Sequence, residues 1–173
     1  MSGFGPRGTW RRCEEILGDE ATDALLLAHE SQSPDEGYIL RWHLDRARER
    51  VSGLSLSHKP GSIVHGDFTA WNLLYVGERL SGVLDFELSH TDHRVADFAL
   101  SWRGKYDAVV HGYDEVSPLT PEEWTLLTPM WWAFLIELAC RHIADGTPLD
   151  GWIIQKILER SPLMSVDAAE FRR

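Results

Sequence analysis

The chain has 173 residues, a hydrophobic fraction of 43% and a formal net charge of −10 at pH 7. That length predicts a single folded domain over residues 1–173, because it suffices to bury a sizeable core. The negative charge argues against nucleic acid or an anionic membrane as partner, since both require a basic surface. A cationic small molecule would suit such a chain better.

The cysteines and the N-terminal sequence favour the cytoplasm. Cys13 and Cys140 lie far apart and lack metal-ligand spacing, and the first residues lack the apolar stretch of a signal peptide. The most apolar segment, residues 124–140, contains Pro129 and Glu137 and is shorter than the ~20 residues of a membrane span. It is therefore interpreted as a core helix.

Three helices are predicted in the first third of the chain, after a flexible start over residues 1–8. Apolar residues recur at helical spacing over residues 9–17, and Asp19 can cap a second helix that ends near Ser31. A third helix is predicted over residues 34–51, with one apolar stripe and opposite charges three or four positions apart.

Strand signals follow a loop at residues 57–61. A short strand begins at Ile63, and two runs at 73–76 and 80–84, joined by Gly77-Glu78-Arg79, predict a β-hairpin.

After the hairpin only helices are predicted. Val95, Phe98, Ala99 and Trp102 would share one helical face. Thr120-Pro121-Glu122-Glu123 is a capping box with proline at the first helical position. The last predicted helix spans residues 148–160, and a frayed tail is expected over 163–173.

Three polar residues at the ends of the apolar β-type runs suggest chemistry. Asp67, Asn72 and Asp85 offer oxygen ligands on rigid elements, which suits Mg²⁺ bound to phosphate. Phosphoryl transfer requires mainly that metal, phosphate and acceptor hydroxyl be positioned. With an ordinary pKa of ~3.9 an aspartate is a weak base near neutrality, so Asp67 would chiefly orient the acceptor hydroxyl. The pattern predicts phosphoryl transfer.

These residues also carry a family resemblance. His65-Gly66-Asp67 with Asn72 five residues after the aspartate, then Leu84-Asp85-Phe86-Glu87 and Asp97-Phe98-Ala99, resemble the aminoglycoside phosphotransferase and choline kinase group of small-molecule kinases. The resemblance covers about residues 62–102. It implies a mostly helical α+β fold, equivalent to the large C-terminal lobe of a protein kinase, in which a short β-hairpin carries the catalytic loop.

The resemblance also implies roles for individual residues. Asp67 would be the catalytic aspartate, and Asn72 and Asp85 would bind Mg²⁺ in the presence of ATP or GTP as phosphate donor. Other implied roles are support of the catalytic loop by His65 and Asp97, nucleotide contact by Leu74 and Leu84, and substrate contact by Glu87 or Asp92.

One part of the family pattern is not matched. Members of the group begin with a sheet-rich lobe that carries a phosphate-covering loop and a lysine, whereas only residues 1–8 precede the first predicted helix, so that lobe is expected to be absent. Residues 3–8 spell G-x-G-x-x-G, but no strand precedes them and Pro6 lacks a backbone donor. They are not expected to bind phosphate. The lysines, none a good candidate for the phosphate lysine, are Lys59, Lys105 and Lys156.

Two functions from different classes therefore stay open. The first is an ATP- and Mg²⁺-dependent kinase of a hydroxyl on a small molecule, completed by a separate N-terminal lobe or by a homodimer. The second is a non-catalytic, truncated kinase-like module that retains an acidic substrate cavity.

Three other features have simpler interpretations. A two-metal hydrolase site at His90–His93 with His65, Asp67 and Asp85 is less favoured than the kinase assignment. Tryptophans 124, 131 and 132 are interpreted as core residues and not as a ligand-stacking surface. A solvated face is favoured over a cation-binding site for the acidic residues Asp107, Asp114, Glu115, Glu122 and Glu123.

Overall fold

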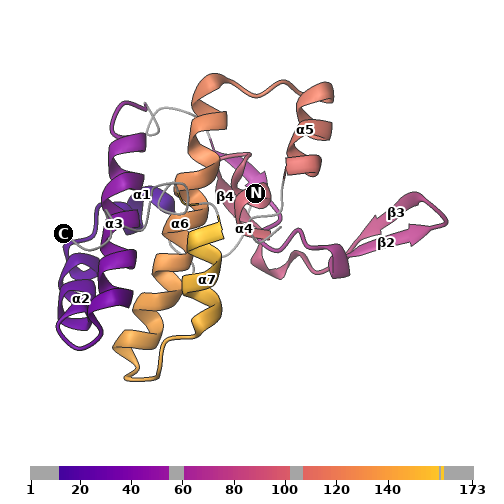
Figure 1. The fold of residues 1–173 in the computed structure, drawn as a ribbon. Helices are drawn as coiled ribbons and strands as arrows, with labels where there is room; N and C mark the ends of the chain where they lie inside the picture. Colours follow the sequence, from indigo (N-terminus) through magenta and orange to yellow (C-terminus); the bar gives the residue numbers. More distant parts are fainter. Residues whose placement is uncertain (1–11, 55–60, 102–106, 160, 162–173) are drawn as a thin grey trace.

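The computed structural model describes residues 12–54, 61–101, 107–159 and 161 (Figure 1). Within these residues the helices are α1 (Cys13–Leu17), α2 (Glu20–Glu30), α3 (Pro34–Val51), α4 (Ala96–Ser101), α5 (Asp107–Val116), α6 (Pro121–Ala144) and α7 (Gly151–Glu159). The strands are β1 (Ser62–Val64), β2 (Leu73–Val76), β3 (Arg79–Val83) and β4 (His90–Asp92), and the 3₁₀ turns are η2 (Ala70–Asn72) and η3 (Phe86–Leu88). The predicted mostly helical α+β fold is confirmed. The features predicted for residues 1–8, 57–60, 102 and 163–173 lie outside the described residues.

Helix α6 forms the centre of the core. It packs against α1, α2, α3, α4 and α7 (Figure 1), and its Trp131 and Trp132 are fully buried. The predicted capping box is present: the Thr120 hydroxyl accepts from the Glu123 amide, and the Glu123 carboxylate accepts from the Thr120 amide at 2.8 Å. The interpretation of this segment as a core helix, continuous through Pro129, is confirmed.

The N-terminal helices follow the sequence signals closely. The Asp19 carboxylate accepts a hydrogen bond from the Ala21 amide at 3.0 Å and so caps α2. Helix α3 has the predicted bounds, and Arg46 and Glu49 pair on its exposed face. Helix α7 begins at Gly151, three residues after the predicted start, because the Asp150 side chain accepts from the Trp152 amide.

A buried histidine connects α3 to the segment that follows α7. His43 Nδ1 lies 2.7 Å from the Ile39 carbonyl, which can only accept, so Nδ1 carries the proton and Nε2 accepts from the Ser161 hydroxyl at 2.7 Å. Burial lowers the pKa of His43 from 6.5 to about 4. The folded protein therefore holds this imidazole in its neutral form.

Stability should fall in acid because of His43. Its pKa is lower in the folded than in the unfolded chain, so its contribution is complete above pH 6.5 and is lost as pH falls toward 4. The lost contribution is about 3 kcal/mol at most. Denaturant unfolding between pH 7.5 and 4.5 should show a shallower pH dependence in His43→Gln than in the wild type. Equal pH dependence in both proteins would contradict the assignment.

Two antiparallel strand pairs organise the chain between residues 62 and 92. Strand β1 pairs with β4, with Val64 opposite His90, and β2 pairs with β3, with Leu73 opposite Val83. The predicted strand at residue 63 and the hairpin are confirmed. Because β4 returns alongside β1, the chain between them, residues 65–89, is held at both ends.

The expectation of helices alone after the hairpin is wrong at β4, and α5 was not predicted. Strand β4 has the sequence His-Thr-Asp, which shows no period-two pattern, so pairing with β1 and not local preference makes it extended. His90, expected in a loop, lies on this strand. Helix α5 contains Gly112, which lowers helix propensity, and its apolar contacts are supplied by the core.

The β2–β3 hairpin projects away from the helical body (Figure 1). Tyr75, Val76 and Leu80 are exposed on it.

Among the described residues no helix is long and apolar enough to cross a membrane. Cys13 and Cys140 are both buried, and burial raises the pKa of the Cys13 thiol.

Candidate active site

The loop from His65 to Asn72, which ends in η2, connects β1 to β2. A single carboxylate supports the start of this loop. The two oxygens of Asp97, at the beginning of α4, accept hydrogen bonds from the backbone amides of His65 and Gly66, each at 2.8 Å. Gly66 has φ +83°, and an added Cβ would lie 2.3 Å from the Leu88 carbonyl oxygen. Glycine is therefore required at this position.

His65 connects this loop to the chain that follows the hairpin. Its Nε2 donates to the Leu84 carbonyl at 2.8 Å, which leaves Nδ1 unprotonated to accept from the Asp67 amide at 3.2 Å. The imidazole also lies against Phe86, with ring centroids 4.7 Å apart. One neutral tautomer thus fixes the backbone at Asp67 relative to the residue that precedes Asp85.

The side chains of Asp67 and Asn72 are in direct contact. Asn72 Nδ2 donates to the Asp67 carboxylate at 3.0 Å and to the Asp67 carbonyl at 2.9 Å. Both bonds use the amide nitrogen, so the amide oxygen Oδ1 of buried Asn72 remains suited to a cation. The Asn72 carbonyl accepts from the Leu84 amide at 2.8 Å, which joins the two segments again.

Asp85 has an unusual backbone. Its φ of 63° and ψ of 67° make it the non-glycine residue with positive φ among the described residues. This conformation is sparsely populated and occurs most often at functional sites, although aspartate tolerates it better than most residues. The Asp85 side chain is exposed, whereas Asp67 is partly buried. Leu84, the residue before Asp85, is hydrogen-bonded through its backbone to the His65 ring and to the Asn72 carbonyl.

The side-chain oxygens of Asp67, Asn72 and Asp85 are of the chemical type that binds Mg²⁺. Two carboxylates and an amide oxygen are hard oxygen ligands, which Mg²⁺ prefers. Within the described ranges no three His, Cys, Asp or Glu side chains are grouped as a metal site. That finding gives the two-metal hydrolase alternative no support.

The candidate nucleotide and substrate residues lie in different environments. Leu74 and Leu84 are each 46% exposed, on β2 and after β3. Glu87 is exposed on η3. Asp92 is buried: its Oδ1 accepts from the His93 amide at 2.7 Å and its Oδ2 lies 3.4 Å from His90 Nε2. Both oxygens of Asp92 thus have contacts within the protein.

Sequence reasoning missed two polar residues near the candidate site, Ser89 and Arg94. The Ser89 hydroxyl donates to the His65 carbonyl at 3.3 Å, and Arg94 pairs with Glu123. Neither belongs to a recognisable motif, so no local signal indicates them.

Two of the acidic residues considered for cation binding have internal roles: Glu123 pairs with Arg94, and Asp114 accepts from the Leu119 amide. Glu115 and Glu122 are exposed, and the Asp107 side chain is not described.

Comparison with known proteins assigns the chain to a family. The model of the phosphotransferase enzyme family matches residues 6–118, which include the whole candidate site. A homoserine kinase of Granulibacter bethesdensis is 26% identical over 154 residues, which is 81% of this chain and 48% of that protein. The chain thus spans about half the length of this curated relative. Since the family model covers most of the chain, the protein belongs to the phosphotransferase enzyme family.

Proposed function

We propose that this chain carries the phosphoryl-transfer site of a small-molecule kinase that phosphorylates a hydroxyl group with Mg²⁺ and ATP or GTP. The observation that carries the proposal is the connected set Asp97–His65–Asp67–Asn72, which holds a carboxylate and an amide oxygen together. The backbone of Leu84, the residue before Asp85, bonds to the same set. The similarity to a homoserine kinase supports a hydroxyl acceptor. The charge of −10 favours an acceptor with a positive group.

Each residue would have a separate task. Asp67 would orient the acceptor hydroxyl and take its proton as transfer proceeds, because the loose transition state needs positioning more than strong basicity. The amide nitrogen of Asn72 fixes the rotamer of Asp67 through the bond to Oδ2. Asn72 Oδ1 and Asp85 would hold Mg²⁺, which would supply positive charge to neutralise that of the phosphate.

The binding site for the phosphate donor needs more polypeptide than one copy of this chain. The described residues contain one lysine, Lys156, and its ammonium pairs with Glu159 on α7. The apolar surface of Leu74 and Leu84 has the character of a nucleotide base contact, but is open on its outer side. We infer that a separate lobe or second chain completes the nucleotide site.

The alternative, a non-catalytic binding module, retains the loop without phosphate transfer. The cytoplasm remains the expected location.

A turnover assay tests the proposed function. The protein, at a concentration at which two copies associate and so complete the nucleotide site, is incubated with Mg²⁺-ATP and, in turn, homoserine, choline and an aminoglycoside, and phosphate ester formation is followed by ³¹P NMR. At least one acceptor should be phosphorylated, and Asp67→Asn should reduce the rate by about a thousandfold, the order expected when positioning and proton acceptance are lost together. Glu78→Gln, an exposed carboxylate change in the hairpin turn, serves as control.

Two results would reject the kinase assignment. One is ester formation at an equal rate in Asp67→Asn and the wild type. The other is the absence of transfer to all three acceptors, together with no Mg²⁺-dependent nucleotide binding. The second result would favour the binding module.

The hairpin surface should make the isolated chain self-associate. Leu74, Tyr75, Val76 and Leu80 are 46–73% exposed on a sheet of only two strands, whose outer edges can pair with another chain. The hairpin carries one glutamate and one arginine, so two copies meet there without the repulsion expected from the overall charge. We propose that a second copy covers this surface.

Analytical ultracentrifugation over a concentration series measures the association. The wild type should form dimers, and Leu80→Glu should shift the equilibrium to monomer. Leu27→Glu is the matched control, since Leu27 is 58% exposed on α2 and Leu80 is 51% exposed. A wild-type monomer at high concentration, or equal effects of the two substitutions, would refute association through the hairpin.

A further inference from the structure

Arg94 stands out in the segment between β4 and α4. All of its guanidinium nitrogens donate. Nε and Nη2 bind the two Glu123 oxygens at 2.6 and 2.7 Å, and Nη2 also binds the Pro118 carbonyl at 2.7 Å. Nη1 donates to the Ser117 hydroxyl at 2.7 Å and contacts the Tyr113 hydroxyl at 3.4 Å. The five N–H groups of an arginine are thus all matched to acceptors.

These acceptors lie on α5, on the chain that follows it and on α6. Glu123 lies in the first turn of α6, where its carboxylate also accepts from the Thr120 amide in the capping box. Ser117 and Pro118 follow α5. Hydrogen bonding to Glu123 raises the pKa of Arg94, so the guanidinium keeps its positive charge. Arg94 therefore fastens the entry to α4 to the central helix and to the end of α5.

The entry to α4 also determines the position of Asp97. Asp97 lies three residues after Arg94, and its carboxylate supports the amides of His65 and Gly66. A second contact runs in parallel: the Arg94 guanidinium lies 5.6 Å from the ring centroid of Tyr113, and that ring packs edge-on against Phe98, the residue after Asp97. Both contacts couple Arg94 to the turn that carries Asp97.

We propose that Arg94 is a positioning residue for the catalytic loop, which acts through Asp97 by fixing the first turn of α4 against α6. The inference rests on the proposed function, because the loop so positioned carries Asp67. Lysine cannot replace arginine here, since a single ammonium cannot reach both Glu123 oxygens, the Ser117 hydroxyl and the Pro118 carbonyl.

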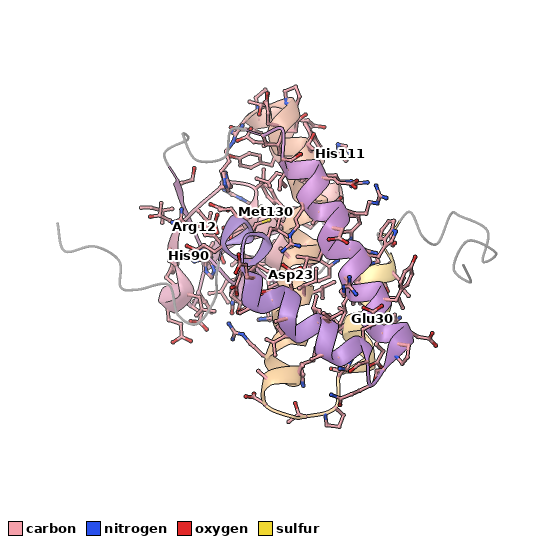
Figure 2. The ribbon with its side chains drawn as sticks, turned by 90° about the vertical axis from the view of Figure 1, so that its left-hand side faces the viewer. Arg12, Asp23, Glu30, His90, His111 and Met130 are labelled. Atoms are coloured by element: carbon pink, nitrogen blue, oxygen red, sulfur yellow. The ribbon has the colours of Figure 1, made fainter. Side chains whose placement is uncertain are left out.

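Arg48 provides a matched control at another place in the fold. Its two Nη atoms bind the Asp23 carboxylate at 2.8 and 2.6 Å, and its Nε binds the Leu17 carbonyl at 2.7 Å. The side chains of Arg94 and Arg48 are similarly exposed, at 25% and 31%. Figure 2 shows Asp23 on α2, whereas His90 lies on the strand segment at the edge of the molecule. Arg48→Lys should therefore lower stability without reaching the loop.

The experiment is amide hydrogen exchange by NMR in Arg94→Lys and Arg48→Lys. Arg94→Lys should lower the protection of the His65 and Gly66 amides by about tenfold relative to the amides of the central part of α6, and should shift their resonances. Arg48→Lys should leave the His65 and Gly66 amides unchanged at a comparable loss of melting temperature. If Arg94→Lys does not fold, Ser117→Ala removes one acceptor and should affect the same amides in the same direction.

Equal protection of His65 and Gly66 in the two lysine variants would overturn the positioning role and leave Arg94 as a stabilising residue only. This readout does not depend on phosphate transfer. A protein that transfers no phosphate but loses protection in Arg94→Lys would refute the proposed function and keep the structural coupling. Normal transfer with unchanged protection would refute the coupling alone.

Discussion

Replacing Asp85 with alanine should abolish Mg²⁺-dependent nucleotide binding while the fold stays intact. The carboxylate is exposed, so its removal leaves no buried partner without a hydrogen bond. A substitution of a metal ligand should weaken affinity by about a hundredfold or more, since even residues that only support ligands cost 10–100-fold. Isothermal titration with Mg²⁺-ATP measures the affinity, and thermal unfolding checks the fold.

Two further variants control for charge and for backbone strain. Asp35→Ala removes an equally charged, exposed aspartate from the first turn of α3 and should leave nucleotide affinity unchanged. Asp85→Asn tolerates the positive φ and keeps an oxygen ligand, so its affinity should lie between those of the wild type and Asp85→Ala. Unchanged Mg²⁺-nucleotide affinity in Asp85→Ala would reject Asp85 as a metal ligand.

Replacing Asp97 with alanine should destabilise the protein far more than replacing Asp67. Asp97 accepts two backbone amides at 2.8 Å, and their loss would leave both donors without a partner. Hydrogen bonds to charged groups contribute about 1.5–3 kcal/mol each, so the melting temperature should fall by roughly 6–15 °C. Asp67 accepts one side-chain bond from Asn72, which makes its loss less costly.

Differential scanning calorimetry of Asp97→Ala, Asp97→Asn and Asp67→Ala measures the order of stability. Asp97→Asn keeps one oxygen for an amide and should lie between the other two. Because Asp67 is partly exposed, Asp67→Ala should change the melting temperature by only a few degrees. A lower melting temperature in Asp67→Ala than in Asp97→Ala would contradict the supporting role of Asp97.

Elements with strong local signals could be predicted from the sequence. These are the capping box at Thr120, the cap at Asp19 and the two runs that flank the Gly77-Glu78-Arg79 turn. Each depends on residues close together in the sequence, and all appear as expected. The order of polar residues in the candidate loop likewise indicated which side chains would be neighbours. Asp97 and the His65 amide, 32 residues apart, were associated through the family resemblance, and they are in contact.

Features that depend on tertiary contacts could not be predicted. Strand β4 pairs with β1, and one β-branched residue, Thr91, is too weak a signal to predict an extended chain alone. Asp92 was considered for substrate contact because it is a carboxylate near the motif, but the fold buries it beside His90. Arg94 finds its acceptors on segments more than 18 residues away, a distance over which sequence patterns carry no signal.

The most direct test of the account is whether Asn72 and Asp85 hold a metal ion next to Asp67. Mn²⁺ added with ADP in place of Mg²⁺ broadens the NMR signals of nearby backbone amides. We predict the strongest broadening at Asp67, Asn72 and Asp85, and its loss in Asp85→Ala. Broadening centred on other acidic surfaces, such as the start of α3, and unaffected by Asp85→Ala would contradict the central claim.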